Sequence, residues 1–110
     1  MLTDEYRYRI LKLLESDPEM SQRRLASELG ISLGRVNYCL QALIEKGLVK
    51  VERFRNSNDK KAYLYALTPS GIEAKAKITV KFLKVKMDEY QALKREVADL
   101  RREAASIKKQ

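Results

Sequence analysis

The chain has 110 residues, and its 23 Lys and Arg against 15 Asp and Glu give a net charge of +8, which favours a polyanionic partner such as nucleic acid or an anionic membrane surface. It has no histidine and a single cysteine, so His-based catalysis, a His or thiolate metal site and an internal disulfide are excluded. Its four glycines are scattered and form no phosphate-cradling loop, so we expect neither an enzyme nor a cofactor nor a bound metal ion.

Three amphipathic helices are predicted in the first half of the chain, within residues 3–17, 21–30 and 32–47. Each range begins with a Ser or Thr that can cap a helix, and the last two end at glycines that can stop one.

The first range has neither the charged start nor the apolar core of a signal peptide. No run of the chain approaches the ~20 apolar residues of a membrane span, so we expect a cytoplasmic protein.

A β-hairpin and a long helix are predicted next. Residues 49–54 and 62–67 are rich in β-branched and aromatic residues, and the polar segment between them is rich in turn formers. Thr68 and Pro69 then provide the cap and the first-turn proline of a helix that we expect to run to about Ser106. This order predicts a mainly α fold with a small β-hairpin (α+β). We place a winged helix-turn-helix domain in residues 1–71 and a dimerisation helix in residues 72–110.

The second and third helices have the spacing of a helix-turn-helix. Ala26 is the small residue that two closely crossing helices need, and Gly30 tolerates the positive φ of the turn. Ile31, Val36 and Cys39 then face inward. An ordinary αα-hairpin would also place leucines here, but the alanine, the glycine and the inward residues together favour the helix-turn-helix.

The outer face of the third helix is suited to reading DNA. Arg35 can donate two hydrogen bonds to guanine, and Asn37 or Gln41 can pair with adenine. Tyr38 can reach a phosphate or a base, and Ser32 at the helix N-terminus can hold a phosphate. A solvated face is the alternative, but only the far end of the helix has its typical mixture of Lys and Glu. The DNA-binding residues predicted here are Gln22, Arg23, Ser32, Gly34, Arg35, Asn37, Tyr38 and Gln41.

The hairpin has a basic tip. A wing of this kind can lie along the phosphate backbone or place a basic side chain in the minor groove, whereas the alternative is a solvated basic loop. The DNA-binding residues predicted in the wing are Arg53, Arg55, Asn56, Lys60 and Lys61.

Several segments together resemble the MarR family of bacterial regulators. They are residues 25–30, Ser32 with Val36, residues 43–49 (Leu-Ile-Glu-Lys-Gly-Leu-Val), residues 59–61 (Asp-Lys-Lys) and residues 67–71 (Leu-Thr-Pro-Ser-Gly). Residues 32–40 and 54–57 resemble in particular the short subclass associated with exopolysaccharide gene clusters. The resemblance implies a regulator of transcription, and so of exopolysaccharide biosynthesis, with its third helix in the major groove and its wing on the flanking backbone or minor groove.

By position, the resemblance makes Arg35, Asn37 and Tyr38 the helix contacts and Lys61 the basic residue of the wing. Many members of the family have an additional N-terminal helix that helps to form a small-molecule pocket. Because this sequence begins at the DNA-binding core, we do not expect a phenolic-ligand pocket of that kind, and the sequence leaves open whether any effector acts. Cys39 occupies an inward helix position, so we expect a packing residue, with redox sensing as the alternative.

The C-terminal helix contains a heptad repeat of apolar residues. The a positions are Ala76, Leu83, Tyr90, Val97 and Ala104, and the d positions are Ile72, Thr79, Lys86, Leu93, Leu100 and Ile107, so the seam is apolar over most of its length and Lys86, beside Met87, interrupts it. Packing on the chain's own domain explains residues 72–83, but residues 90–107 extend too far at ~1.5 Å per residue. A repeat of this length predicts a coiled coil. We therefore expect a homodimer through Leu83, Met87, Tyr90, Leu93, Val97, Leu100 and Ile107.

The charges beside this repeat favour a parallel pair of helices. Glu89, Glu96 and Glu103 occupy g positions, and Lys94, Arg101 and Lys108 occupy the e positions five residues further along. In a parallel, in-register pair each glutamate faces a basic residue of the partner, whereas an antiparallel pair places like charges together. The alternative is that these basic residues serve only the C-terminus of their own helix, where positive charge interacts favourably with the helix dipole.

Two functions from different classes are consistent with these features. The first is a sequence-specific regulator that binds double-stranded DNA, and the polar outer face and the basic wing favour it. The second is a protein-interaction scaffold built on a winged helix. A run of lysines between residues 75 and 86 could contact phosphates, although such a run is more often a solvated face. Membrane association of this basic helix is not expected, because glutamates follow the run.

Overall fold

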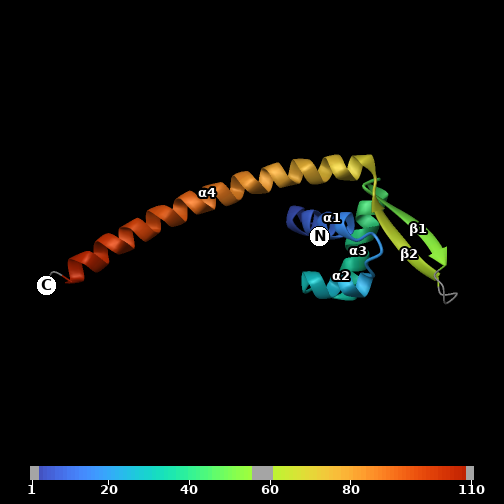
Figure 1. Ribbon diagram of the computed structural model, residues 1–110, viewed down its shortest axis with the longest axis horizontal. Helices are drawn as coiled ribbons and strands as arrows, with labels where there is room; N and C mark the ends of the chain where they lie inside the picture. The colour runs from blue at the N-terminus through green and yellow to red at the C-terminus, as the bar shows by residue number, and fades with distance from the viewer. Residues whose placement is uncertain (1–2, 56–60, 109–110) are drawn as a thin grey trace. The chain divides into compact units, whose positions relative to one another are not determined.

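The computed structural model describes residues 3–55 and 61–108. Its elements are α1 (Asp4–Ser16), α2 (Gln22–Leu29), α3 (Leu33–Glu45), β1 (Val49–Arg55), β2 (Lys61–Leu67) and α4 (Pro69–Lys108) (Figure 1). The chain forms two compact units, Met1–Ile78 and Thr79–Gln110. The predicted fold class is confirmed: a mainly helical winged helix with one antiparallel hairpin and a long C-terminal helix. The domain boundary after residue 71 stays a prediction.

The first three helices begin at the predicted capping residues. The side-chain oxygens of Thr3, Ser21 and Ser32 each accept a backbone N–H from the residue three positions later, at 3.1 to 3.2 Å. Each cap satisfies one of the N–H groups that a helix N-terminus leaves without an intrahelical partner. Gly30 and Gly47 adopt positive φ angles of 69° and 73°, which turn the chain after α2 and α3.

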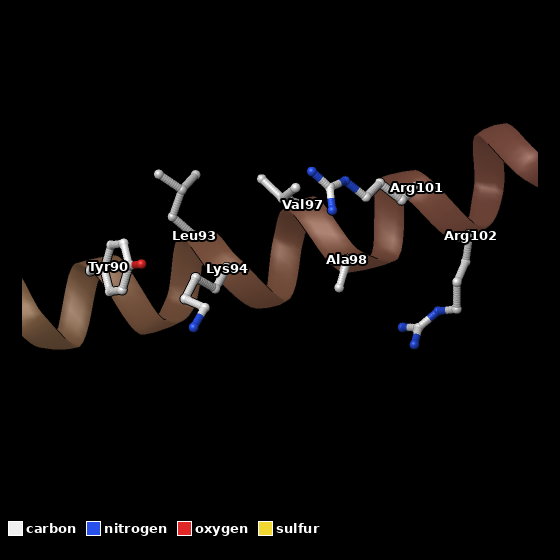
Figure 2. A pocket seen from close by; sticks show the side chains of 7 residues that line it. All are labelled: Tyr90, Leu93, Lys94, Val97, Ala98, Arg101 and Arg102. Carbon is white, nitrogen blue, oxygen red and sulfur yellow. The ribbon is translucent and has the colours of Figure 1, made fainter.

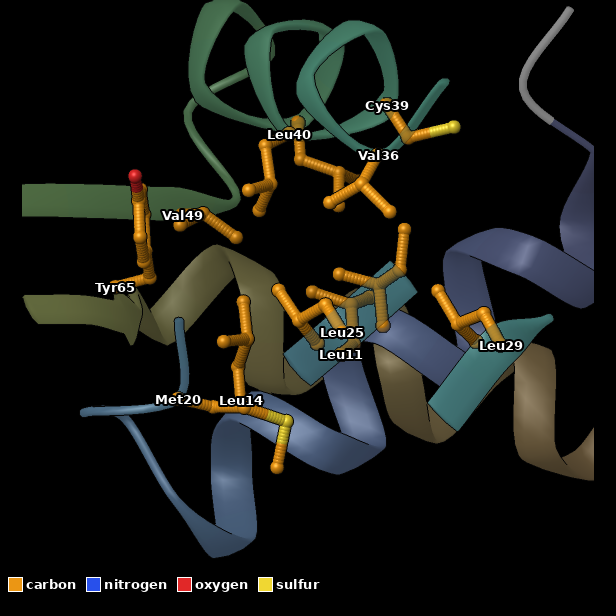
Figure 3. Close-up of a cluster of buried hydrophobic side chains, with 12 residues drawn as sticks. Leu11, Leu14, Met20, Leu25, Leu29, Val36, Cys39, Leu40, Val49 and Tyr65 are labelled. Carbon is orange, nitrogen blue, oxygen red and sulfur yellow. The ribbon is translucent and has the colours of Figure 1, made fainter. Parts of the chain in front are cut away.

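One apolar core holds the first unit together. Leu11 and Leu14 of α1, Leu25 of α2 and Leu40 of α3 are fully buried. Figure 3 shows these side chains converging from the three helices, with Val49 and Tyr65 of the hairpin at one side. Within the part of the chain that the structure describes, the buried residues of this core are Ile10, Leu11, Leu14, Met20, Leu25, Leu29, Val36, Cys39, Leu40, Leu43, Val49 and Tyr65. Since α3 directs one face into this core, its opposite face is presented outward.

The hairpin is tied to the helices through its second strand. Strands β1 and β2 pair antiparallel, from Val49 opposite Leu67 to Arg55 opposite Lys61. The backbone N–H of Tyr65 donates to the carbonyl oxygen of Pro18, at 2.9 Å, in the loop between α1 and α2. This hydrogen bond and the buried ring of Tyr65 place the hairpin beside the helix-turn-helix.

The start of α4 packs closely against the turn between α3 and β1. The Thr68 hydroxyl donates to the carbonyl oxygen of Gly47, at 2.6 Å, and accepts the N–H of Gly71, at 3.0 Å. A Cβ atom on Gly71 would overlap the backbone carbonyl oxygen of Leu48. In this unit Gly71 and Ile78 are the buried residues of α4, whereas Ile72, a predicted d position, is 54% exposed. The apolar stripe of the heptad repeat and the inward face of the helix are therefore different faces here.

The second unit consists of the remainder of α4. Between residues 79 and 108, every side chain except that of Phe82 is exposed, and the apolar ones recur along the helix. Among the described residues, no helix combines the length and the apolarity that are needed to cross a membrane.

Candidate nucleic-acid interface

The outer face of α3 carries the side chains that the sequence selects for reading DNA. Val36, Cys39, Leu40 and Leu43 are buried on the other side of the helix. All of the predicted residues of this helix are exposed, and they are Ser32, Gly34, Arg35, Asn37, Tyr38 and Gln41. Residues 32–41 include no acidic residue. The face therefore presents hydrogen-bonding groups, one cation and one aromatic ring to the solvent without a carboxylate to repel phosphate.

Arg35 has a specific neighbour on α1. Its guanidinium carbon lies 5.4 Å from the centroid of the Tyr6 ring, within the range of a cation–π interaction. Its backbone N–H donates to the hydroxyl of Ser32, at 3.1 Å. The sequence places Tyr6 on the apolar face of the first helix and gives no sign of this contact, because the two residues are far apart in the chain.

Gln22 and Arg23 lie at an open groove between the start of α2 and the hairpin. Glu19, Ser21, Gln22, Arg23, Leu33, Tyr63 and Tyr65 line this groove. The side-chain amide of Gln22 donates to the hydroxyl of Tyr65, at 3.0 Å, and Gln22 is half-buried. Arg23 is exposed. Gln22 therefore joins α2 to the wing, while Arg23 is the more accessible of these two predicted contacts.

The wing has an aromatic support beneath its cationic side chain. The guanidinium carbon of Arg53 lies 5.6 Å from the centroid of the Tyr63 ring. Tyr63 in turn stacks on Tyr65, with ring centroids 6.2 Å apart and planes at 25°. Neither tyrosine is among the residues predicted from the sequence, although their alternating positions on one strand place them on one face. The side chains of Arg55 and Lys61, and the whole of Asn56 and Lys60, lie outside the described residues.

Cys39 lies in the core behind the reading face. Its side chain is only 1% exposed. Burial raises the pKa of the Cys39 thiol, and the positive charges of the N-terminus and Arg35 oppose that shift. Since the thiolate is the reactive form, a raised pKa makes this thiol a poor nucleophile at neutral pH. These surroundings favour the packing interpretation of Cys39 over redox sensing.

Comparison with known families identifies this arrangement. Residues 3–50, from the cap of α1 to the start of β1, match the family model described as winged helix-turn-helix DNA-binding. The chain has the winged helix-turn-helix fold. Within this winged helix, α2 and α3 form the helix-turn-helix and β1 and β2 form the wing. A comparison with curated proteins finds no match.

Solved structures of other proteins share the fold. A MarR/EmrR family regulator from Acinetobacter sp. ADP1 has a TM-score of 0.63 and 24% identity, over 77% of this chain and 58% of that one. A variant of Lactococcus lactis ZitR has a TM-score of 0.62 and 29% identity, over 84% and 60%. A PadR-like transcriptional regulator from Bacillus cereus has a TM-score of 0.71 and 18% identity, over 79% and 89%.

These comparisons confirm the predicted resemblance to MarR-family regulators at the level of the fold, and the exopolysaccharide subclass stays a prediction. This chain spans less than two thirds of the length of the first two of these proteins. Within residues 3–55 and 61–108, no group of three or more His, Cys, Asp or Glu side chains is placed to hold a metal ion.

Proposed function

We propose that this chain is a sequence-specific regulator of transcription that binds double-stranded DNA with α3 in the major groove. The observation that carries the proposal is the outer face of α3, where Arg35, Asn37 and Gln41 are exposed opposite a buried apolar side. These three side chains are the types that form paired hydrogen bonds with guanine and adenine edges. The family match over residues 3–50 and the net charge of +8 support the same function.

The wing adds contacts to the DNA backbone or minor groove in this proposal. Arg53 is exposed and lies over the Tyr63 ring, so its charge is held near the start of the hairpin loop. The predicted contacts Arg55, Asn56, Lys60 and Lys61 follow it in the sequence. Basic side chains at such positions supply the salt-dependent part of DNA affinity.

The second part of the proposal is a homodimer formed through α4. Tyr90, Leu93, Val97, Leu100 and Ile107 are all large apolar side chains that are exposed on this helix. Figure 2 shows Leu93 and Val97 projecting from the same side, in the shallow pocket that Tyr90 and Arg101 also line. A second copy of the chain is the occupant that the charges favour, because the glutamates at g face basic residues at e in a parallel pair.

Each exposed charge pair contributes only ~0.2–1 kcal/mol, so the charges select the orientation and apolar burial supplies most of the affinity. Such a dimer provides two winged domains for a DNA site with two-fold symmetry. We place this regulator in the cytoplasm and assign it no catalytic activity and no membrane contact.

A salt titration separates this function from that of a winged-helix scaffold. The affinity of the full chain for a random duplex is measured by fluorescence anisotropy at several salt concentrations. A DNA-binding protein is expected to show a logarithm of affinity that falls linearly with the logarithm of salt concentration. A scaffold that uses its winged helix for protein contacts would show no saturable binding at low salt, and that result would contradict the proposal.

A further inference from the structure

The contact between Tyr6 and Arg35 joins the first turns of two helices. The Tyr6 N–H donates to the cap hydroxyl of Thr3, at 3.2 Å, and the Arg35 N–H donates to the cap hydroxyl of Ser32, at 3.1 Å. Both backbones are thus fixed at their helix starts. The guanidinium carbon of Arg35 lies 5.4 Å from the ring centroid of Tyr6, which is half-buried. A partly buried ring on a capped helix is a rigid platform for an otherwise exposed side chain.

The type of contact matters for what Arg35 can do. An aromatic face attracts a guanidinium through the ring quadrupole and does not occupy the N–H donors in its plane. A carboxylate partner would occupy two of those donors in a bidentate pair. Within the described part of the chain, no carboxylate pairs with Arg35. The N–H donors of the Arg35 guanidinium are therefore held in one region and stay available to an acceptor on DNA.

We propose that Tyr6 is a positioning residue that determines how well Arg35 discriminates between DNA sequences. The inference rests on the proposed function, in which Arg35 reads a base edge. A free arginine loses rotamer entropy when it forms a bidentate contact, whereas a guanidinium already held over a ring loses less. Tyr6 thereby favours the specific complex, in which Arg35 needs one geometry, over the non-specific complex, which tolerates many.

The test compares two substitutions of Tyr6, one that removes the aromatic ring and one that keeps it. Duplexes selected by the wild-type protein from a random pool are the specific probes, and a random duplex is the non-specific one. Tyr6→Leu is expected to lower the ratio of specific to random affinity about two- to fivefold, the range that an exposed cation–π contact supplies. Tyr6→Phe retains a ring and is expected to keep the ratio of the wild-type protein.

Two further measurements separate positioning from other roles of Tyr6. In an Arg35→Ala background, Tyr6→Leu is expected to cause no additional loss, whereas a direct contact of Tyr6 with DNA would persist there. Thermal unfolding shows whether Tyr6→Leu is folded, and Tyr6→Met, which also lacks a ring, takes its place if it is not.

The outcomes distinguish this inference from the proposed function. A wild-type protein that binds all duplexes equally overturns both. A wild-type protein with a clear preference, whose preference is unchanged or increased in folded Tyr6→Leu or Tyr6→Met, overturns the positioning role alone. A loss of equal size in the Arg35→Ala background also overturns it.

Discussion

Arg35 and Cys39 lie one helical turn apart on α3, yet their surroundings are opposite. Arg35 is exposed, with its guanidinium against the Tyr6 ring, while Cys39 is buried in the core. Helical periodicity in the sequence is sufficient to separate these two sides, because 3.6 residues per turn fix which positions share a face. The periodicity does not predict the partner that each exposed side chain finds on another element.

The first prediction concerns Arg35. Because a bidentate contact with guanine contributes to discrimination, Arg35→Ala is expected to cost ~1–3 kcal/mol of specific binding and to relax the preference at one base position of a half-site. Arg95→Ala on α4 removes the same charge from an exposed position outside the interface, and it serves as the matched control. Both variants are measured against selected and random duplexes. An equal loss of affinity for all sequences in Arg35→Ala would show that Arg35 holds a phosphate.

At the scale of the secondary-structure elements, short-range signals account for what the sequence predicts well. Ser and Thr caps and glycine stops act within a few residues, and so the predicted starts of α1, α2 and α3 agree with the structure. The contacts of Gln22 with Tyr65 and of Arg35 with Tyr6 join elements that are distant in the chain. Nothing in the local pattern around any of these four residues specifies its partner, so this part of the site was not predictable.

The second prediction concerns the junction between the wing and α4. Gly71→Ala gains up to ~1 kcal/mol of helix propensity, but its new Cβ overlaps the carbonyl oxygen of Leu48, which belongs to the backbone and cannot rotate away. Overpacking of this kind typically costs ~1–3 kcal/mol, so we expect a net loss of stability. The measurement is the midpoint of urea unfolding. Ser70→Ala, at an exposed neighbouring position, is expected to stay within about 0.5 kcal/mol of the wild-type protein. Unchanged stability in Gly71→Ala would mean that α4 does not begin so close to Leu48.

At the scale of the whole molecule, size and surface both point to association. A domain of this size buries only ~60% of the surface that its unfolded chain exposes, which makes it marginal alone. The apolar side chains of residues 80–107 of α4, apart from Phe82, are exposed in the single chain, and Leu100, for example, is 56% exposed. Exposed apolar surface of this extent marks an interaction site. A dimer through α4 explains both features without a further component.

The third prediction tests the orientation of that dimer. Leu100→Cys is introduced in a Cys39→Ser background, and the protein is oxidised gently. In a parallel, in-register pair the two d positions at residue 100 face each other, so rapid crosslinking is expected. Arg95→Cys in the same background is the control, because its f position points away from the seam and is expected to crosslink slowly. A confirmed dimer in which Leu100→Cys crosslinks no faster than Arg95→Cys would exclude the parallel arrangement.

Selection of bound sequences from a pool of random duplex DNA tests the central claim, that two copies of α3 read DNA in a sequence-specific way. The predicted result is an enriched motif with two inverted half-sites, whose centres are about 10 base pairs or a multiple of this distance apart. Duplexes with this motif are expected to bind at least ~10³-fold more tightly than random ones at the same salt concentration. A pool that still has its starting composition after repeated rounds, and that binds no more tightly than at the start, would contradict the claim.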